Sequence, residues 1–584
     1  MSTILSLHDP ADARRYYDEG TWRDDTLYAL MAGHAASRPS AFALRDATRR
    51  LTWAALRDWT DAVADDLHAA GVRRGQRVGV WLPNRVEALV AFLACSRNGY
   101  VCTPSLHRNH TTAQIIGLMR RVRAAALVVQ PGYGADAARA DIVAKSGEIE
   151  TLRRLYALGP AGEAARAHGT DPAREAASLM ALAGALPPAA PAPTIPFPPA
   201  SAPPRRLIEP DRNPDKIVYL AFTSGTTGEP KGVMHSDNTL LANGRPMVAD
   251  WNLGPDTVIL SLSPMSHHIG TVALEQALVA GCELVLDDPP AGRSRLDWIV
   301  ETGATYVMGV PTHAIDVQAA MKRAGLARLG KVAMFYMAGA PIPREVCRAF
   351  LQIGVTPQNI YGMTENGSHQ YTLPSDDEET IVGTCGRANA GYEVRIFAAD
   401  DPDREVPVGT VGQIGSRGGN LTLGYFADQA VTEASFNASG WFMSGDLGVL
   451  DARGCLTIMG RQKDLIIRGG HNIHPAQIED LALAHPRIEK AAVFGVADAR
   501  LGEKVCLAYI AADHAEIPAD ALLAHLDRAG LSRYDMPEFV IALPEFPLTP
   551  SGKILKRELV EWVKSGRVTP TPVRFGAASE EKLA

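Results

Sequence analysis

The sequence is poor in cysteine and has no long apolar run. Its seven cysteines are scattered, odd in number and never spaced as Cys-x-x-Cys, which predicts neither a disulfide framework nor a zinc site and suits a reducing compartment. No apolar stretch approaches the roughly 20 residues that cross a bilayer, and residues 1–10 lack the basic-then-apolar pattern of a signal peptide. We therefore expect a soluble, cytoplasmic protein with no membrane span.

An excess of positive charge is also lacking. The chain carries 58 Lys and Arg against 65 Asp and Glu, a net charge of −7, and both signs are dispersed rather than gathered into a basic stripe. Nucleic acid binding is therefore not expected. The composition, 46% hydrophobic and 21% charged, is that of a globular protein, and 584 residues are too many for one ordinary core, so we expect at least two domains.

Helical spacing alternates with short apolar strands along the chain. A helix over residues 61–72 is followed by a strand at 78–82 and a helix at 88–97, which is typical of an α/β fold with mostly parallel sheets. Open sheets of this kind bind ligands at the carboxyl ends of their strands, so we expect the chemistry there. Later strands are predicted at residues 216–222, 257–262, 305–309, 332–337 and 356–360.

A Pro/Ala-rich segment covers about residues 187–206 and predicts an extended surface linker. The alternative is a proline-rich recognition segment, but no basic or aromatic pattern accompanies the prolines. A linker is therefore the preferred interpretation.

A Gly/Thr-rich loop follows the predicted strand at 216–222. Its glycines allow close backbone approach, and its hydroxyls and lysine are donors that could wrap a polyphosphate. It is not a Walker loop, because Pro230 precedes the lysine and Gly232 follows it. Taken alone it also fits a hairpin turn. The loop reads Thr223-Ser224-Gly225-Thr226-Thr227-Gly228-Glu229-Pro230-Lys231-Gly232.

Seven further segments follow this loop along the sequence. They are Pro264-Met265-Ser266-His267-His268-Ile269-Gly270, Ala338-Gly339-Ala340-Pro341, Tyr361-Gly362-Met363-Thr364-Glu365, Gly440-Trp441-Phe442-Met443-Ser444-Gly445-Asp446, Gly460-Arg461-Gln462-Lys463-Asp464, Gly469-Gly470-His471-Asn472-Ile473 and Pro547-Leu548-Thr549-Pro550-Ser551-Gly552-Lys553-Ile554. With the Gly/Thr-rich loop they resemble the motifs of the adenylate-forming acyl- and aryl-CoA synthetases, relatives of luciferase and of peptide-synthetase adenylation domains. The resemblance runs from residue 51 to residue 557. Ser266 departs from it by replacing an aromatic residue, and Ser444 by replacing threonine.

The resemblance implies a role for each segment. The nucleotide would be bound by Thr223, Ser224, Gly225, Thr226, Thr227, Gly228, Lys231, Gly339, Ala340, Pro341, Tyr361, Gly362, Thr364, Asp446, Arg461 and Lys553, with Tyr361 stacked on adenine and Asp446 accepting both ribose hydroxyls. Glu365 would hold Mg²⁺, a role that suits a hard carboxylate beside phosphates. The catalytic residues would be Lys553, Thr364, Glu365 and His267. His267 fits a structural hydrogen bond at least as well.

The acyl pocket and the second half of the reaction are implied in the same way. Lys463 would be the hinge, and Gly469 and Gly470 would line the CoA tunnel. The pocket would draw on His267, His268, Val310, Met337, Ala338, Gly339 and Met363, a set that fits a medium-chain, alicyclic or aromatic acid.

The resemblance implies an ATP-dependent carboxylic acid:CoA ligase that forms acyl-AMP on Mg²⁺ and then acyl-CoA. Its expected fold is a large N-terminal domain of several subdomains with mostly parallel sheets, residues 1–463, and a small mobile α+β domain, residues 464–584. Two alternatives stay open: an adenylation enzyme that loads a carrier-protein thiol, and a nucleotide-binding pseudo-enzyme. A luciferase-like oxygenase is remote. A homodimer is expected from base rates alone.

Overall fold

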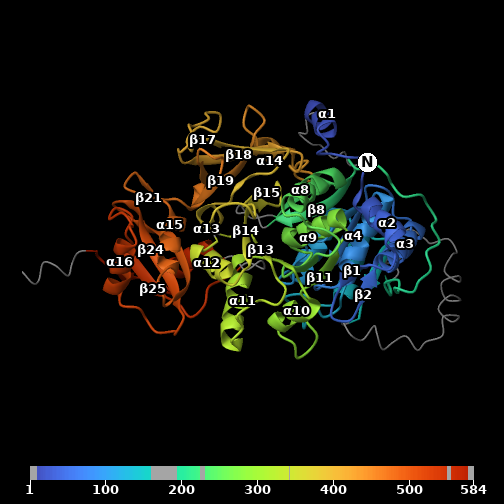
Figure 1. Cartoon of the computed structure of the whole chain (residues 1–584), viewed down its shortest axis with the longest axis horizontal. Helices are drawn as coiled ribbons and strands as arrows, with labels where there is room; N and C mark the ends of the chain where they lie inside the picture. The colour runs from blue at the N-terminus through green and yellow to red at the C-terminus, as the bar shows by residue number, and fades with distance from the viewer. Residues whose placement is uncertain (1–9, 160–193, 224–229, 341, 549–553, 576–584) are drawn as a thin grey trace, which may run out of the picture.

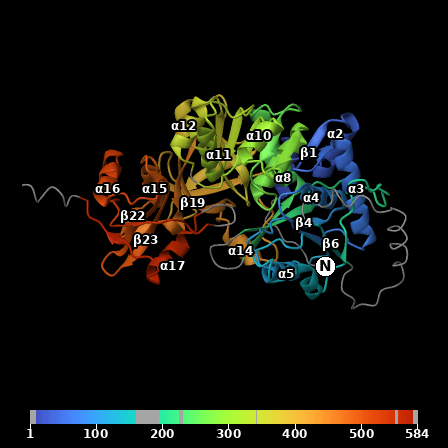
Figure 2. The same cartoon turned by 90° about the horizontal axis from the view of Figure 1, so that it is seen from below.

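The computed structural model describes residues 10–159, 194–223, 230–340, 342–548 and 554–575. Its α/β elements form four sheets, and the elements of the last sheet gather at one end of the molecule (Figure 1). Figure 2 shows the same grouping from below, with α15 (Pro475–Leu483), α16 (Ala519–Arg528) and α17 (Lys556–Lys564) at that end. Over the described residues, no helix has the length and apolarity needed to cross a bilayer.

The first sheet is parallel except for its last strand. The order β7-β6-β5-β3-β4-β8-β9 places β8 next to β4, and β9 turns back antiparallel to β8. Strands such as β3 are buried at every position, which explains why they read as continuous apolar runs. The strands are β3 (Arg77–Trp81), β4 (Val101–Thr103), β5 (Ala126–Val129), β6 (Arg154–Ala157), β7 (Thr194–Ile195), β8 (Ile217–Thr223) and β9 (Lys231–Ser236).

The second sheet has nine strands in the order β16-β15-β14-β13-β12-β10-β11-β1-β2. Its centre, from β14 to β1, is parallel, and β2, β15 and β16 add antiparallel edges. The strands are β1 (Phe42–Arg45), β2 (Arg50–Thr52), β10 (Val258–Ser261), β11 (Glu283–Leu286), β12 (Tyr306–Gly309), β13 (Met334–Met337), β14 (Thr356–Met363), β15 (Gly367–Tyr371) and β16 (Arg387–Ala388). The α/β expectation and the five later strands predicted from the sequence are confirmed.

Helices join the two sheets into one body. A single apolar core includes Val78 from the first sheet, Ile259 from the second, and residues of α2, α3, α4 and α9. The helices α8 and α9 lie side by side between the sheets (Figure 1). The helices are α1 (Pro10–Asp18), α2 (Leu27–Ser37), α3 (Trp53–Ala69), α4 (Val86–Asn98), α5 (Thr112–Arg121), α6 (Ile142–Lys145), α8 (Asp237–Asp250), α9 (His268–Ala280), α10 (Arg295–Thr302), α11 (Pro311–Ala324), α12 (Arg344–Gln352) and α13 (Glu378–Gly383).

Local sequence sets where α8 and α9 begin and end. Ser236 caps α8 through the backbone N–H of Thr239, and the Thr239 hydroxyl accepts from the Ser236 N–H in return. α9 ends at Gly281, whose φ of 66° is the left-handed conformation that favours glycine after a helix. The two helices therefore start close to the strands that carry the predicted motifs.

A third, antiparallel sheet leads to the C-terminal elements. It contains β17 (Tyr392–Phe397), β18 (Gly412–Gly418), β19 (Phe442–Leu450) and β20 (Leu456–Arg461), with α14 (Gln429–Ala434) beside it. The fourth sheet contains β21 (Ile466–Arg468), β22 (His471–Ile473), β23 (Ile488–Asp498), β24 (Gly502–Ala511), β25 (Phe539–Ala542) and β26 (Thr571–Pro572), covered by α15, α16 and α17.

The C-terminal elements have apolar cores of their own. Within the described part of the chain, the buried clusters end at Leu456 on one side and resume at Ile466 on the other. The predicted boundary at 463/464 falls between these clusters, in the short helix η2 (Gln462–Asp464).

The end of the predicted linker is docked on the body. Residues 194–206 are extended, but β7 pairs with β6, and Phe197 is buried against Trp59 and Tyr156. The Trp59 indole N–H donates to the Pro198 carbonyl at 2.6 Å. This part lies on the surface as expected, and its one phenylalanine attaches it to the first sheet. Residues 187–193 lie outside the described residues.

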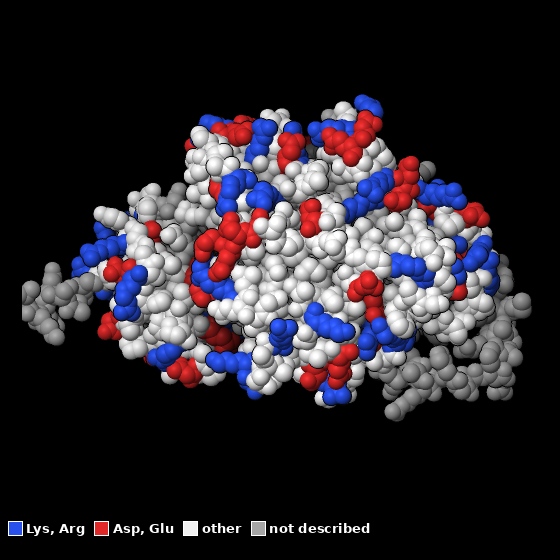
Figure 3. Space-filling model, viewed as in Figure 1, with Lys and Arg blue, Asp and Glu red and all other residues white. Residues whose placement is uncertain are grey.

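The charged residues of the visible face are interspersed. Figure 3 shows Lys and Arg next to Asp and Glu in groups around broad uncharged areas of this face, with no basic stripe. Positive and negative residues, which are dispersed along the sequence, are therefore also mixed on this surface.

Candidate active site

The Gly/Thr-rich loop joins the antiparallel strands β8 and β9. Thr223 pairs with Lys231 across the hairpin, and an Arg121 guanidinium N–H donates to the Pro230 carbonyl at 2.8 Å. The Lys231 ammonium lies 5.0 Å from the centre of the Tyr425 ring. The predicted residues Ser224, Gly225, Thr226, Thr227 and Gly228 lie outside the described residues. The structure thus defines the base of the loop and the position of its lysine.

Glu365 follows the end of β14 by two residues, and its side chain is buried. The Tyr425 hydroxyl donates to Glu365 Oε1 at 3.0 Å, and the Thr422 N–H donates to the Glu365 carbonyl at 2.6 Å. Burial raises the pKa of the Glu365 carboxyl, and the nearby Lys231 charge works in the opposite direction. A chain of contacts therefore runs from Lys231 through Tyr425 to Glu365. Tyr425 is missing from the sequence prediction, although it stands in the Gly424-Tyr425-Phe426 turn.

Tyr361 and Asp446 come from different sheets and meet. The Tyr361 hydroxyl donates to Asp446 Oδ2 at 2.9 Å, and Arg461 Nε lies 3.2 Å from Asp446 Oδ1. Asp446 and Arg461 are paired residues of β19 and β20. Burial first, and the Asp446 charge second, raise the pKa of Tyr361 well above its usual value, so the phenol stays a donor. Three residues predicted to bind one nucleotide are thereby brought into direct contact.

Gly362 is required by a close backbone approach. A Cβ at this position would lie 1.8 Å from the Gly367 carbonyl oxygen, closer than atoms can approach. The segment 361–365 therefore folds against residues 367 and 368, and any larger side chain would push them apart.

The predicted acyl-pocket residues follow neighbouring strands of the second sheet. His267 comes after β10, Val310 after β12, Ala338 after β13, and Met363 ends β14. Since β10, β12, β13 and β14 are adjacent and parallel, these residues share one edge of the sheet. Met337 ends β13, and Gly339 and Ala340 continue the same turn. Pro341 lies outside the described residues.

His267 and His268 occupy the start of α9 in different ways. His267 caps the helix, its Nδ1 accepting from the Ile269 N–H at 3.3 Å. The His268 ring forms a three-ring cluster with Tyr219 and His235, whose centres lie 5.9 and 6.0 Å from it and 6.1 Å from each other. Burial, followed by the neighbouring imidazoles, lowers the pKa of His268 well below its usual value. The structural hydrogen bond that the sequence suggested for His267 is therefore present, as the N-terminal cap of α9.

A hollow of about 670 Å³ opens beside His267. Its wall comes from the carboxyl ends of β4, β5 and β10 and from the first turn of α11. Burial lowers the pKa of both His107 and His313 to about 4, so these imidazoles are neutral hydrogen-bonding groups. Volumes of this order suit small-molecule sites. The lining residues are His107, Arg108, Asn109, Tyr133, Gly134, Ala135, Ser263, Pro264, Ser266, His267 and His313.

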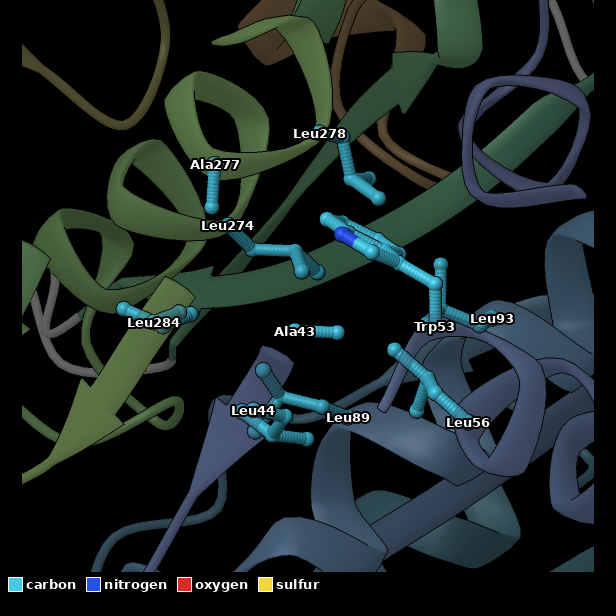
Figure 4. A pocket seen from close by; sticks show the side chains of 10 residues that line it. All are labelled: Ala43, Leu44, Trp53, Leu56, Leu89, Leu93, Leu274, Ala277, Leu278 and Leu284. Carbon is cyan, nitrogen blue, oxygen red and sulfur yellow. The ribbon is translucent and has the colours of Figure 1, made fainter. Parts of the chain in front are cut away.

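The residues that the first sheet contributes to this wall, 107–109 and 133–135, were not predicted from the sequence. These residues follow β4 and β5 directly, so the rule that sites form at strand ends could have found them. A second cavity of about 10 Å³, shown in Figure 4, is lined by Trp53 and by Leu and Ala side chains alone. It is a packing gap in the apolar core and offers no chemistry.

The C-terminal motifs lie before, within and beyond the strands of the fourth sheet. Gly469 and Gly470 connect β21 to β22 with φ angles of 60° and 88°. Lys463 lies in η2, between the third and fourth sheets. Lys553 lies outside the described residues, but the base of its turn does not: Leu548 bridges to Ile554, and the Lys556 ammonium pairs with Glu479 at 2.6 Å.

No described residues gather as three or more His, Cys, Asp or Glu side chains able to hold a metal ion. Glu365 nevertheless has the chemistry that Mg²⁺ prefers, a hard carboxylate that burial makes reluctant to stay charged without a cation. One carboxylate beside a bound polyphosphate is the usual arrangement for this ion. The residues present therefore fit a magnesium ion that is shared with a nucleotide.

Comparison with known proteins identifies the class. The family model of the AMP-binding enzymes matches residues 31–426, and that of the AMP-binding enzyme C-terminal domain matches residues 477–553. The chain belongs to the AMP-binding enzyme family, which confirms the resemblance found in the sequence.

Individual relatives extend over nearly the whole chain. The medium-chain fatty-acid–CoA ligase of Escherichia coli is 28% identical over 561 residues, covering 95% of this chain and 93% of the relative. The sulfoacetate–CoA ligase of Cupriavidus necator is 32% identical over 540 residues, covering 92% and 97%. The ATP-bound structure of MatB from Rhodopseudomonas palustris superimposes with a TM-score of 0.77 at 27% identity, covering 93% and 100%. The anthranilate CoA ligase AuaEII, at 21% identity and a TM-score of 0.79, covers 93% and 98% and supports the fold.

Proposed function

We propose that this protein is an ATP-dependent carboxylic acid:CoA ligase that forms acyl-AMP and pyrophosphate, and then acyl-CoA and AMP. The observation that carries the proposal is the contact of Tyr361 with Asp446 and of Asp446 with Arg461. These residues lie up to 100 positions apart, yet they form one polar unit beside the segment that carries Thr364 and Glu365. An aromatic face, a carboxylate with two acceptor oxygens and a guanidinium suit the base and ribose of a nucleotide.

In the first step the substrate carboxylate attacks the α-phosphorus of ATP and pyrophosphate leaves. Both reactants are anionic, so the chain must supply positive charge and donors where they meet. Lys231 stands at the base of the loop proposed to wrap the phosphates, and Thr364 is proposed to contact the α-phosphate. Lys553 would reach the reacting oxygens from its turn. Mg²⁺ held by Glu365 would, when bound, neutralise phosphate charge.

In the second step a thiol attacks the acyl carbon and AMP leaves. We propose that residues 464–584 turn about Lys463 between the two steps, withdrawing Lys553 and presenting Gly469 and Gly470 to the thiol. The separate apolar cores on the two sides of η2 support a rigid unit that can move. The small glycine turn between β21 and β22 would let the thiol arm pass close to the backbone.

The acid would bind at the strand-end edge that carries His267, Val310, Ala338 and Met363. Small residues in the turn after β13 leave room beside these side chains, and the hollow next to His267 adds space that is open to solvent. A medium-chain, alicyclic or aromatic acid fits this mixture of apolar and imidazole groups. CoA is the proposed acceptor of the acyl group.

A screen of acids by pyrophosphate release tests the proposal. Fatty, cyclohexane-type and aryl acids are each supplied with ATP and Mg²⁺, with and without CoA. Turnover that needs both one class of acid and CoA is expected. Acid-dependent adenylate that CoA cannot discharge would instead point to a carrier-protein thiol, and the absence of acid-dependent pyrophosphate release would point to a nucleotide-binding protein without turnover.

A further inference from the structure

A buried histidine outside the recognised motifs contacts the catalytic segment. His235 stands near the end of β9, the strand that begins with Lys231, and only 1% of the residue is exposed. Its Nε2 lies 2.7 Å from the carbonyl oxygen of Thr364, and its Nδ1 lies 3.0 Å from the Thr239 hydroxyl. One imidazole thus connects the start of α8 to the residue proposed to contact the α-phosphate.

The chemistry of the two partners fixes the state of the ring. A carbonyl oxygen can only accept, so Nε2 carries the proton and donates to Thr364. Burial lowers the pKa of His235 to about 4, so the ring is neutral at ordinary pH, and its Nδ1 accepts from the Thr239 hydroxyl. That hydroxyl also accepts from the Ser236 N–H at 2.9 Å, and the Ser236 carbonyl, at 3.2 Å, is a second and longer acceptor for its proton. The Thr364 carbonyl therefore sets the tautomer, and the Thr239 hydroxyl supports it from the Nδ1 side of the ring.

The segment that His235 contacts is held at its other residues too. The Asn420 amide donates to the Asn366 carbonyl at 2.9 Å, and the Ser368 N–H donates to Asn243 Oδ1 at 2.7 Å. With the Thr422 N–H on the Glu365 carbonyl, these contacts come from two other segments, residues 420–422 and α8. His235 contacts the remaining residue, Thr364, and it belongs to β9, the strand that also positions Lys231.

We infer that His235 is a positioning residue, whose neutral ring sets the placement of Thr364 and Glu365 by donating from Nε2 to the Thr364 carbonyl. The inference rests on the proposed function of Thr364. Burying an imidazole costs more than burying an aliphatic side chain of the same size, so the position is better explained by this contact than by packing alone. Because the ring also stacks on His268 of α9, it ties the wall of the acyl pocket to the nucleotide segment.

Two amide substitutions separate positioning from packing. The amide nitrogen of Gln can occupy the place of Nε2, and that of Asn only the place of Nδ1. His235→Gln should therefore keep adenylation close to that of the wild type. His235→Asn should lower kcat for pyrophosphate release by about tenfold to a hundredfold, the cost of a displacement of about 1 Å, with a smaller change in the KM of the acid.

Hydrogen exchange of a peptide that covers residues 364–368 gives a readout without catalysis. We expect faster exchange in the Asn variant and wild-type exchange in the Gln variant. Equal rates and equal exchange in the two variants would overturn the inference. A wild type that releases no pyrophosphate with any acid would overturn the proposed function, while the exchange data would still decide whether His235 holds the segment.

A second pair of variants covers the case in which the Asn variant does not fold. Thr239→Ser keeps the hydroxyl that faces Nδ1 of His235, whereas Thr239→Val removes it at nearly the same size. Slower adenylation and faster exchange at 364–368 in the Val variant alone would support the inference. The same behaviour in both Thr239 variants would contradict it.

Discussion

Glu275 makes the stability of the large domain depend on pH in an unusual direction. This residue of α9 is fully buried, and the Asn243 amide donates to its Oε2 at 2.7 Å. Its Oε1 has no hydrogen-bond partner among the described residues. Burial raises the pKa of Glu275 from 4.5 to about 8, against a smaller lowering by Asn243. The folded protein therefore keeps a proton that the unfolded chain releases above pH 4.5.

The linkage gives the sign and size of the effect. Below pH 4.5 both states are protonated and the group contributes nothing; between pH 4.5 and 8 the unfolded state ionises first, so the free energy of unfolding falls as pH rises. At about 1.4 kcal/mol per pH unit, the loss from pH 6 to pH 8 is about 2 kcal/mol. At about 2.1 cal/mol/K of unfolding entropy per residue over the large domain, this corresponds to about 2–3 °C in Tm.

Glu275→Gln removes the titration and keeps the shape. Its Tm relative to the wild type should rise by about 2–3 °C when thermal unfolding is measured at pH 8 instead of pH 6. Glu150→Gln, at an exposed position, is the matched control for the loss of one negative charge. A difference between the Glu275→Gln variant and the wild type that stays constant over this range, or that shrinks with rising pH, would refute a protonated Glu275.

Three substitutions in the proposed site separate its roles. Lys553→Ala should slow acid-dependent pyrophosphate release by roughly two to three orders of magnitude and largely spare thioester formation from pre-made acyl-AMP; equal loss of both half-reactions would contradict this division. Asp446→Ala, which also strips Tyr361 and Arg461 of their partner, should weaken ATP binding far more than acid binding, and unchanged nucleotide affinity in a titration would exclude the ribose role. Tyr425→Phe removes the donor to Glu365 and should raise the Mg²⁺ concentration for half-maximal rate roughly tenfold, whereas an unchanged requirement would separate Tyr425 from the metal.

The strands and the family could be predicted from the sequence because both depend on local pattern. The apolar runs at 257–262 and 305–309 are buried on both faces, and they became β10 and β12. The family could be recognised because motif residues such as Lys231, Glu365 and Asp446 follow one another in the family's order. The roles assigned to these residues stay predictions until their variants are measured.

Contacts between distant segments could not be predicted in the same way. Nothing near Tyr425 signals that its hydroxyl meets Glu365, and nothing near His235 signals that its ring meets Thr364. The two contacts depend on how residues 422–426 and β9 pack against the segment that follows β14. The docking of Phe197 on Trp59 was likewise hidden, because a Pro/Ala-rich composition indicates an extended chain but not what that chain lies against.

One chain is proposed to perform two chemical steps through a bound acyl-AMP. A single-turnover reaction with the best acid, ATP and Mg²⁺ but no CoA, analysed by mass spectrometry, separates the two steps. We expect enzyme-bound acyl-AMP in amounts comparable to the enzyme, converted to acyl-CoA and AMP when CoA is added. Acyl-CoA that forms without any detectable acyl-AMP, or with ADP and phosphate as products, would contradict it.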